Sequence, residues 1–206
     1  ERRASKDLLF LWDKQLSESA ARIVEKRLLA VKKLNMLANL MQRRISAGKE
    51  NLSISYELHG FEGEPPRVTC ELIPWYNQKI EESRDLDILR GSTSIGPQRD
   101  DLLFEVNGIN LRSFGSQGQQ RTGVLALKLS ELEFLRSETG EYPILLLDDV
   151  MSELDQTRRE KLMDFIGKER IQTLITATDA AYLPMEILGN LFHVVSGEVV
   201  RKKGIP

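Results

Sequence analysis

Two adjacent carboxylates follow a short apolar run in the last third of the chain. Ile144 to Leu147 are four consecutive aliphatic residues, and Asp148 and Asp149 come directly after them. Such a run is typical of a buried parallel strand, and ligands bind at the carboxyl ends of these strands. We expect Asp148 to bind Mg²⁺, directly or through water, and Asp149 to orient or deprotonate an attacking water. The alternative is a pair of acids in a strand-to-helix loop.

A second candidate site lies about 30 residues upstream. Ser116 follows a turn at Gly115 and opens a long helix with Gln117, Gly118 and Gln119. Ser116 can cap the first helical turn, and the free N–H groups with the positive helix end form an anion site. Gly118 lets a phosphate approach closely. An ordinary capped helix start is the alternative, but the acidic strand end favours a site that faces phosphate.

Two other polar segments leave two interpretations open. Residues 171–177 form another apolar strand, after which Thr178 or Asp179 reaches a phosphate or its water, or Asp179 caps the next helix. In the turn at 96–101, Arg99 either pairs with neighbouring acids or contacts phosphate across a domain junction.

Periodicity indicates which elements position these residues. Residues 1–47 lack Gly and Pro and carry one apolar stripe, which predicts a long helix, broken at most once near 17–19. A strand or an extended linker over 52–59 and a helix over 68–90 follow, with the prolines at 65 and 66 suited to the start of that helix and Gly91 at its end. The two helices are expected to pack antiparallel as an arm. Trp12, Trp75, Tyr76 and Cys70 are expected to pack within it.

The order of elements after residue 96 predicts an α/β core with a parallel sheet and flanking helices. Asn107-Gly108 marks the turn of a first hairpin, and Ser196-Gly197 that of a last one. The expected elements are a hairpin over 103–111, a helix over 116–136, a strand over 143–148, a helix over 155–167, a strand over 171–177, a short helix near 181–188 and a hairpin over 192–200.

Composition narrows the class of protein. The 206 residues are 41% hydrophobic and 29% charged, which suits a soluble globular chain with a real core. No apolar run approaches the ~20 residues that span a bilayer. One cysteine excludes an internal disulfide, and two distant histidines argue against a histidine metal cluster, so a reducing, cytoplasmic setting is expected.

Charge is unevenly distributed along the chain. Residues 1–50 carry 12 Lys/Arg against 6 Asp/Glu, whereas the remainder carries 17 against 25. A basic arm on an acidic body is either a nucleic-acid contact or a solvated helix face. The candidate DNA-binding residues are Lys32, Lys33, Arg43 and Arg44, together with Arg2, Arg3 and Lys26.

Four motifs in this order and spacing resemble the C-terminal portion of the bacterial RecF family. They are G-P-Q-R-D-D, F-G-S-Q-G-Q-Q-R-T, Y-P-I-L-L-L-D-D-V-M-S-E-L-D and Q-T-L-I-T-A-T-D. The resemblance implies part of an ABC-type P-loop ATPase head, related to SMC proteins, over 93–206. It also implies that residues 1–92 are a helical arm, the second lobe of the family.

The resemblance assigns roles to the candidate residues. Ser116 to Gln119 match the signature motif, which touches the γ-phosphate of ATP held by the other subunit. Asp148 and Asp149 match the Walker B acids, and Ser152 and Asp155 belong to the D-loop, although Asp155 also suits a helix cap. Thr178 falls where transporter relatives have a switch histidine, which puts histidine-based sensing in doubt.

The same resemblance implies a DNA replication and repair protein that acts in recombination and the SOS response. Family members bind ATP with Mg²⁺, bind double-stranded DNA and single-strand/double-strand junctions, and dimerise when ATP is bound. They act with RecR and RecO to load RecA at gaps, and their ATPase is weak. No membrane partner is implied.

One element of the family is absent from this sequence. No G-x-x-x-x-G-K-[ST] occurs, so the phosphate-binding loop is expected to lie in a lobe outside these residues, and the chain alone is expected to be inactive. Other possible functions are an SMC-like architectural protein, a transporter ATPase subunit and a non-catalytic interaction module.

Overall fold

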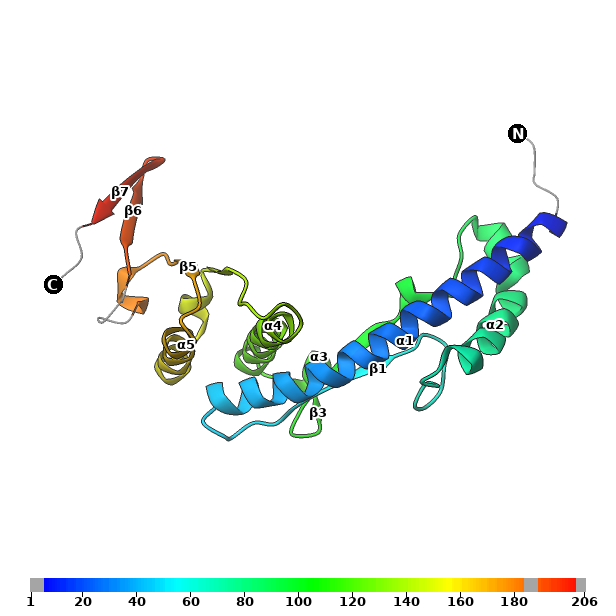
Figure 1. Cartoon of the computed structure of the whole chain (residues 1–206), viewed down its shortest axis with the longest axis horizontal. Coiled ribbons are helices and arrows are strands. Elements are labelled where there is room, and N and C mark those ends of the chain that lie inside the picture. Colours follow the sequence, from blue (N-terminus) through cyan, green and yellow to red (C-terminus); the bar gives the residue numbers. More distant parts are fainter. Residues whose placement is uncertain (1–5, 184–188, 203–206) are drawn as a thin grey trace.

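The computed structural model describes residues 6–183 and 189–202, and one long helix organises most of them. Helix α1 (Lys6–Ile45) runs past α2 (Thr69–Arg90) at one end and α4 (Gln117–Thr139) at the other (Figure 1). The long helix predicted from the apolar stripe is confirmed, and the break that the sequence allowed near 17–19 does not occur. Ser17 is fully buried within the helix, and its hydroxyl donates to the Lys14 carbonyl at 2.9 Å, so the serine is satisfied without interrupting the helix.

Helices α1 and α2 pack antiparallel, as the sequence predicts. Arg84 of α2 pairs with Asp13 of α1 at 2.8 Å, whereas Thr69 at the start of α2 bonds to Glu25, farther along α1. Their shared core consists of apolar side chains from both helices and from the strand that follows α1, namely Ala20, Ala21, Val24, Tyr56, Leu58, Leu72, Tyr76 and Ile80.

The C-terminal end of α2 follows local chemistry, but two packing predictions in the arm are wrong. Gly91 ends the helix in the left-handed conformation at φ 66°. Tyr76 is fully buried and Trp75 stacks edge-on against it at 4.8 Å, as expected. Trp12, in contrast, is 67% exposed, and Cys70 lies exposed in the first turn of α2, because both point away from the shared core.

An antiparallel sheet joins the beginning and the middle of the chain. Strands β1 (Leu52–Glu57), β2 (Asp101–Val106) and β3 (Ile109–Asn110) pair in that order. The hairpin turn at Asn107-Gly108 has both residues at positive φ, as expected for this dipeptide. Leu111 was expected in the strand but begins the short helix α3 (Leu111–Phe114), where its side chain is buried.

The expected α/β class with a parallel sheet is confirmed. Strands β4 (Leu145–Asp148) and β5 (Thr173–Thr176) pair in parallel, and α5 (Gln156–Glu169) connects them after a 3-10 turn over Val150–Glu153. The main core joins the C-terminal half of α1 to α4, α5 and these strands. This core and the β1–β2 pairing both cross residue 92, the expected boundary between arm and head.

A separate hairpin ends the described chain. Strands β6 (Leu191–Val195) and β7 (Glu198–Lys202) flank Ser196-Gly197, as predicted, and lie at the opposite end of the molecule from α2 (Figure 1). Of the short helix expected near 181–188, the structure has a 3-10 turn over Ala180–Tyr182, and residues 184–188 lie outside the described part.

Candidate functional site

Ser116 and Gln119 form a reciprocal cap at the start of α4. The Ser116 hydroxyl accepts from the Gln119 amide at 3.2 Å, and the Gln119 side chain accepts from the Ser116 amide at 3.1 Å. This capping box fixes where the helix begins. It also aims the first-turn N–H groups and the positive helix end outward, which is the geometry of an anion site.

The glycines around this helix start have different reasons to be glycine. A Cβ on Gly115 would lie 2.6 Å from the Leu111 carbonyl oxygen, and one on Gly123 would lie 2.9 Å from a Leu111 methyl group. Packing therefore requires both. A Cβ on Gly118 would meet only the Arg158 guanidinium, at 3.7 Å, which is an ordinary contact. Local packing does not require Gly118, and its missing side chain leaves the helix start open.

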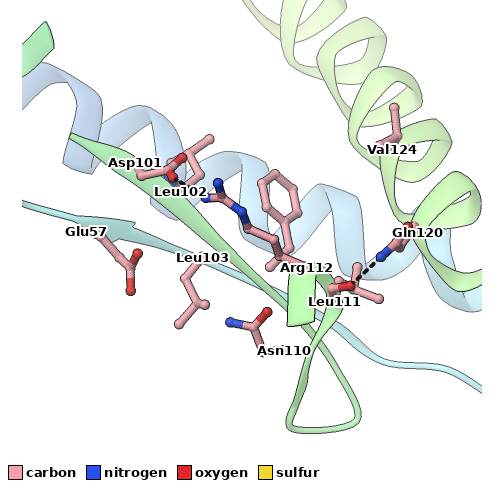
Figure 2. A pocket seen from close by; sticks show the side chains of 10 residues that line it. Glu57, Asp101, Leu102, Leu103, Asn110, Leu111, Arg112, Gln120 and Val124 are labelled. Carbon is pink, nitrogen blue, oxygen red and sulfur yellow. Dashed lines mark hydrogen bonds and ion pairs between the residues drawn. The ribbon is translucent and has the colours of Figure 1, made fainter. Parts of the chain in front are cut away.

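Gln120, the next residue but one, turns away from this opening. Its amide donates to the Leu111 carbonyl at 2.8 Å and so ties α4 to α3. Figure 2 shows this bond at one end of a hollow of about 420 Å³ beside β2, with the Arg112–Asp101 ion pair on its rim. None of the predicted site residues lines this hollow, so it is separate from the candidate site.

The two acids of the strand end occupy different backbone states. Asp148 is the last residue of β4, whereas Asp149 leaves the strand with φ 51° and begins the 3-10 turn. Both residues are exposed. The strand therefore sets the direction of the Asp148 side chain only. The left-handed backbone of the turn sets the direction of the Asp149 side chain. Mg²⁺ is usually held by one or two carboxylates together with phosphate oxygens and water, and the exposed Asp148 carboxylate fits that donor set.

Residues 152–155 lie next to these acids and next to the α4 start. The Ser152 hydroxyl donates to the Asp149 carbonyl at 2.8 Å. Asp155 caps α5 by accepting from the Arg158 amide at 2.9 Å, so its interpretation as a helix cap is confirmed. Leu154 between them is buried and anchors the segment to the core.

One ion pair joins this segment to α4, and two others hold Arg158 beside it. Arg121 of α4 lies 3.5 Å from Glu153, with both side chains nearly half exposed. Arg158 pairs with Asp155 at 2.8 Å and with Glu50 at 3.3 Å, and its guanidinium lies 3.7 Å from the position that a Cβ on Gly118 would take. The structure thus brings the α4 start, residues 152–155 and the end of β4 to one side of the molecule.

The neighbouring strand end supplies a residue that sequence analysis missed. Thr176 is the register partner of Asp148 and bonds to it, whereas Thr178 lies exposed in a bend beyond the strand. Asp179 accepts from the Ala181 amide at 2.8 Å, which confirms it as a cap of the next turn. Pairing of the two apolar runs as parallel strands would have identified Thr176, because it places the ends of the runs, Asp148 and Thr176, side by side.

The 96–101 turn joins the arm to the sheet through its buried acid. Asp100, whose side chain is 2% exposed, accepts from the Tyr56 hydroxyl and, at 3.0 Å, from the His59 amide. Burial, followed by the bond to Asp100, raises the pKa of Tyr56 to about 12. Arg27 donates to Tyr56 at 3.2 Å. Arg99 bonds to the Thr93 carbonyl, so pairing with neighbouring acids, one of the two interpretations that the sequence left open, is not what holds it.

The basic candidates on α1 are exposed but partly engaged with the protein. Lys33 pairs with Glu138 of α4 at 2.9 Å, Arg43 donates to Asn51 at 2.7 Å, and Arg44 lies over the Phe165 ring at 5.0 Å. Lys32 and Lys26 are exposed. Arg2 and Arg3 lie outside the described residues.

Within residues 6–183 and 189–202, no cluster of three or more His, Cys, Asp or Glu side chains is arranged to hold a metal alone. An ion at Asp148 would therefore need oxygen ligands from elsewhere, such as phosphate. In the same part of the chain, no helix has the length and apolarity to cross a membrane.

Comparison with known proteins finds relatives that are DNA replication and repair proteins. No protein-family model matches it. The DNA replication and repair protein RecF of Halothermothrix orenii is 49% identical over 172 residues, which cover 84% of this chain and 46% of the relative. RecF of Alkaliphilus oremlandii is 45% identical over 198 residues, covering 92% and 52%. The chain spans about half the length of the curated relatives it matches.

Solved structures give the same result for the fold. The recombination mediator RecF with ATP superimposes with a TM-score of 0.79 at 34% identity, covering 98% of this chain and 52% of that one. A structure described as concerning ATP-driven dimerisation and DNA-stimulated activation of SMC ATPases matches with a TM-score of 0.52 at 11% identity. That second similarity concerns the fold alone.

Proposed function

Because the chain belongs to the RecF family of DNA replication and repair proteins, we propose that it contributes to two shared ATP sites, with Asp148 and Asp149 at the ATP of its own subunit and the α4 start at the ATP of a second copy. The grouping of the α4 start, residues 152–155 and the end of β4 on one side carries this proposal. An open helix end suits the phosphates of a nucleotide, and exposed carboxylates suit the Mg²⁺ that accompanies it. In this arrangement ATP and Mg²⁺ are held on a phosphate-binding loop outside these residues.

The α4 start then meets the γ-phosphate from the opposite side, in a second copy of the protein. Ser116, Gln117, Gly118 and Gln119 supply the open helix end in trans, and Ser152 and Asp155 lie beside it. Thr178 is proposed as the position that faces the phosphate from the β5 side, in place of a switch histidine. ATP bound by one copy would thus provide the γ-phosphate that the α4 start of the other copy contacts.

The chemistry at the β4 end falls to two acids. Asp148 would hold the metal ion that accompanies ATP, and the bound ion would supply positive charge to offset that of the phosphates. Asp149 orients the attacking water and accepts its proton. Because both carboxylates are exposed here, they are accessible to a nucleotide. We propose a weak ATPase that the isolated 206-residue chain does not display.

The test is the mass of the full-length form, meaning these residues together with the remainder that RecF relatives carry. Sedimentation velocity is expected to show a dimer with ATP and Mg²⁺ and a monomer with ADP. The 206-residue chain should stay monomeric with either nucleotide, since it has no phosphate-binding loop. Equal mass with ATP and with ADP would contradict the proposal.

We further propose that the dimer acts in the cytoplasm on double-stranded DNA and at single-strand/double-strand junctions, with RecR and RecO, to load RecA at gaps. The RecF relatives and the exposed basic residues of α1 support this role. An SMC-like rod is disfavoured, because α1 packs against α2 and α4 rather than extending as a free coiled coil.

DNA contact by Lys32 and its neighbours predicts a steep salt dependence of binding. Each phosphate that the protein neutralises contributes about −0.9 to the slope of log K against log salt concentration. Lys32→Ala in the full-length form is expected to reduce this slope by about one, measured by fluorescence anisotropy at several salt concentrations. Lys128→Ala is the control, because Lys128 lies on α4 and not on the arm helix α1, and it pairs with Glu131 of the same helix. A slope near zero for the wild type would exclude phosphate contact by the arm.

A further inference from the structure

A single hydroxyl group bridges the two acids at the end of β4. Thr176 is the last residue of β5 and the register partner of Asp148 across the parallel pair. Its Oγ1 donates to Asp148 Oδ1 at 2.5 Å and accepts from the Asp149 backbone amide at 3.0 Å. The hydroxyl therefore uses its one donor on Asp148 and one of its acceptor lone pairs on Asp149, the next residue.

The bond to Asp148 restricts an otherwise exposed carboxylate. An exposed aspartate samples several rotamers, and fixing one oxygen orients the other. With Oδ1 held by Thr176, the remaining oxygen, Oδ2, is left to act as a ligand. Carboxylates that bind metal ions are generally held in this way by a neighbouring group, which sets their orientation.

The bond to the Asp149 amide acts on the backbone. Asp149 has φ 51°, a left-handed conformation that costs an L-residue about 1 kcal/mol or more and that Asp tolerates better than most. The Thr176 hydroxyl, which accepts from the Asp149 N–H, stabilises this turn and thereby the direction of the Asp149 side chain. One threonine thus sets the direction of both acids.

We propose that Thr176 is a positioning residue of the nucleotide site, acting through Asp148 on metal binding and through the Asp149 amide on the placement of that carboxylate. The inference rests on the proposed ATP site but adds a residue and a role to it. Thr176 does not itself touch the nucleotide in this scheme. Its contribution is to hold both acids in position before the ligand arrives.

Thr176→Val tests the hydroxyl without changing the shape of the strand. Valine is β-branched and close in size, so the strand is expected to form normally. In the full-length form, the variant should need about 10-fold or more Mg²⁺ for half-maximal ATPase, as for other residues that support metal ligands. Thr176→Ser keeps the hydroxyl and should restore the wild-type value.

Two measurements report on the hydroxyl independently of turnover. Mn²⁺ binding in the presence of ATP, followed by electron paramagnetic resonance, should weaken about 10-fold in Thr176→Val. Amide hydrogen exchange of the segment around Asp149 should accelerate, because its acceptor is lost. Thr173→Val is the matched control. That threonine lies on the same strand, and its hydroxyl donates to the Ile171 carbonyl at 2.9 Å, away from the acids.

The outcomes separate this inference from the function on which it rests. Wild-type Mn²⁺ affinity and exchange in Thr176→Val, with Asp148→Asn still weakening Mn²⁺ binding, would overturn the positioning role alone. Absence of nucleotide-dependent Mn²⁺ binding in the wild type would overturn the proposed ATP site and the inference together. Equal effects of Thr173→Val and Thr176→Val would show a general strand defect and would also overturn it.

Discussion

Asp149→Asn in the full-length form is expected to lower kcat for ATP hydrolysis by about 10²–10⁴-fold, the usual contribution of a general base. Asparagine keeps the size of the side chain but cannot accept the proton of the attacking water. It also tolerates the left-handed backbone found at this position, φ 51°, so the turn should be preserved. ATP binding and the ATP-dependent dimer should therefore survive, and they are measured by equilibrium dialysis and sedimentation velocity.

Asp179→Asn is the matched control for this loss. Asp179 follows the neighbouring strand and caps a turn through a side-chain oxygen, which asparagine also provides. Its kcat should remain within about 2-fold of the wild type, because a preserved cap leaves surrounding structure unchanged. A wild-type kcat for Asp149→Asn would mean that another group activates the water. Loss of ATP binding in that variant would point to a role in holding the nucleotide.

Elements governed by local chemistry were predictable from sequence. Gly91 ends α2, Asn107-Gly108 turns the first hairpin and Ser116 begins α4, because each depends on a few adjacent residues. The motifs then predicted that the α4 start and the end of β4 both serve nucleotide binding. Sequence spacing did not show how these parts touch one another.

Contacts between distant residues account for what was missed. Thr176 meets Asp148 only through strand pairing, and Asp100 meets Tyr56 across 44 positions of sequence. The sequence around Thr176 and Asp100 gives no sign of these contacts. The predicted burial of Trp12 was wrong for a related reason. Tryptophan is a residue type that is usually buried, but the position of α2 decides which face of α1 is covered.

Gly118→Ala is expected to weaken the ATP-dependent dimer by about 10-fold or more, equivalent to ~1.4 kcal/mol or more, while each subunit still binds ATP. The added methyl group would meet only Arg158 within its own chain, at 3.7 Å, so the fold should accept it. At the open start of α4, however, it would occupy the space through which the partner's phosphate approaches the N–H groups. Sedimentation velocity with ATP across a range of protein concentrations measures the dimer affinity.

Gly167→Ala makes the same chemical change near the C-terminal end of α5, the end of that helix far from Asp155 and Arg158. A Cβ there would meet nothing within 4 Å, and both variants replace glycine in a helix, which favours folding by at most ~1 kcal/mol. A difference between them therefore reports on the α4 start and not on helix stability. Equal dimer affinity in the two variants would remove Gly118 from the interface. Loss of ATP binding by Gly118→Ala would instead mean that this helix end serves its own subunit's nucleotide.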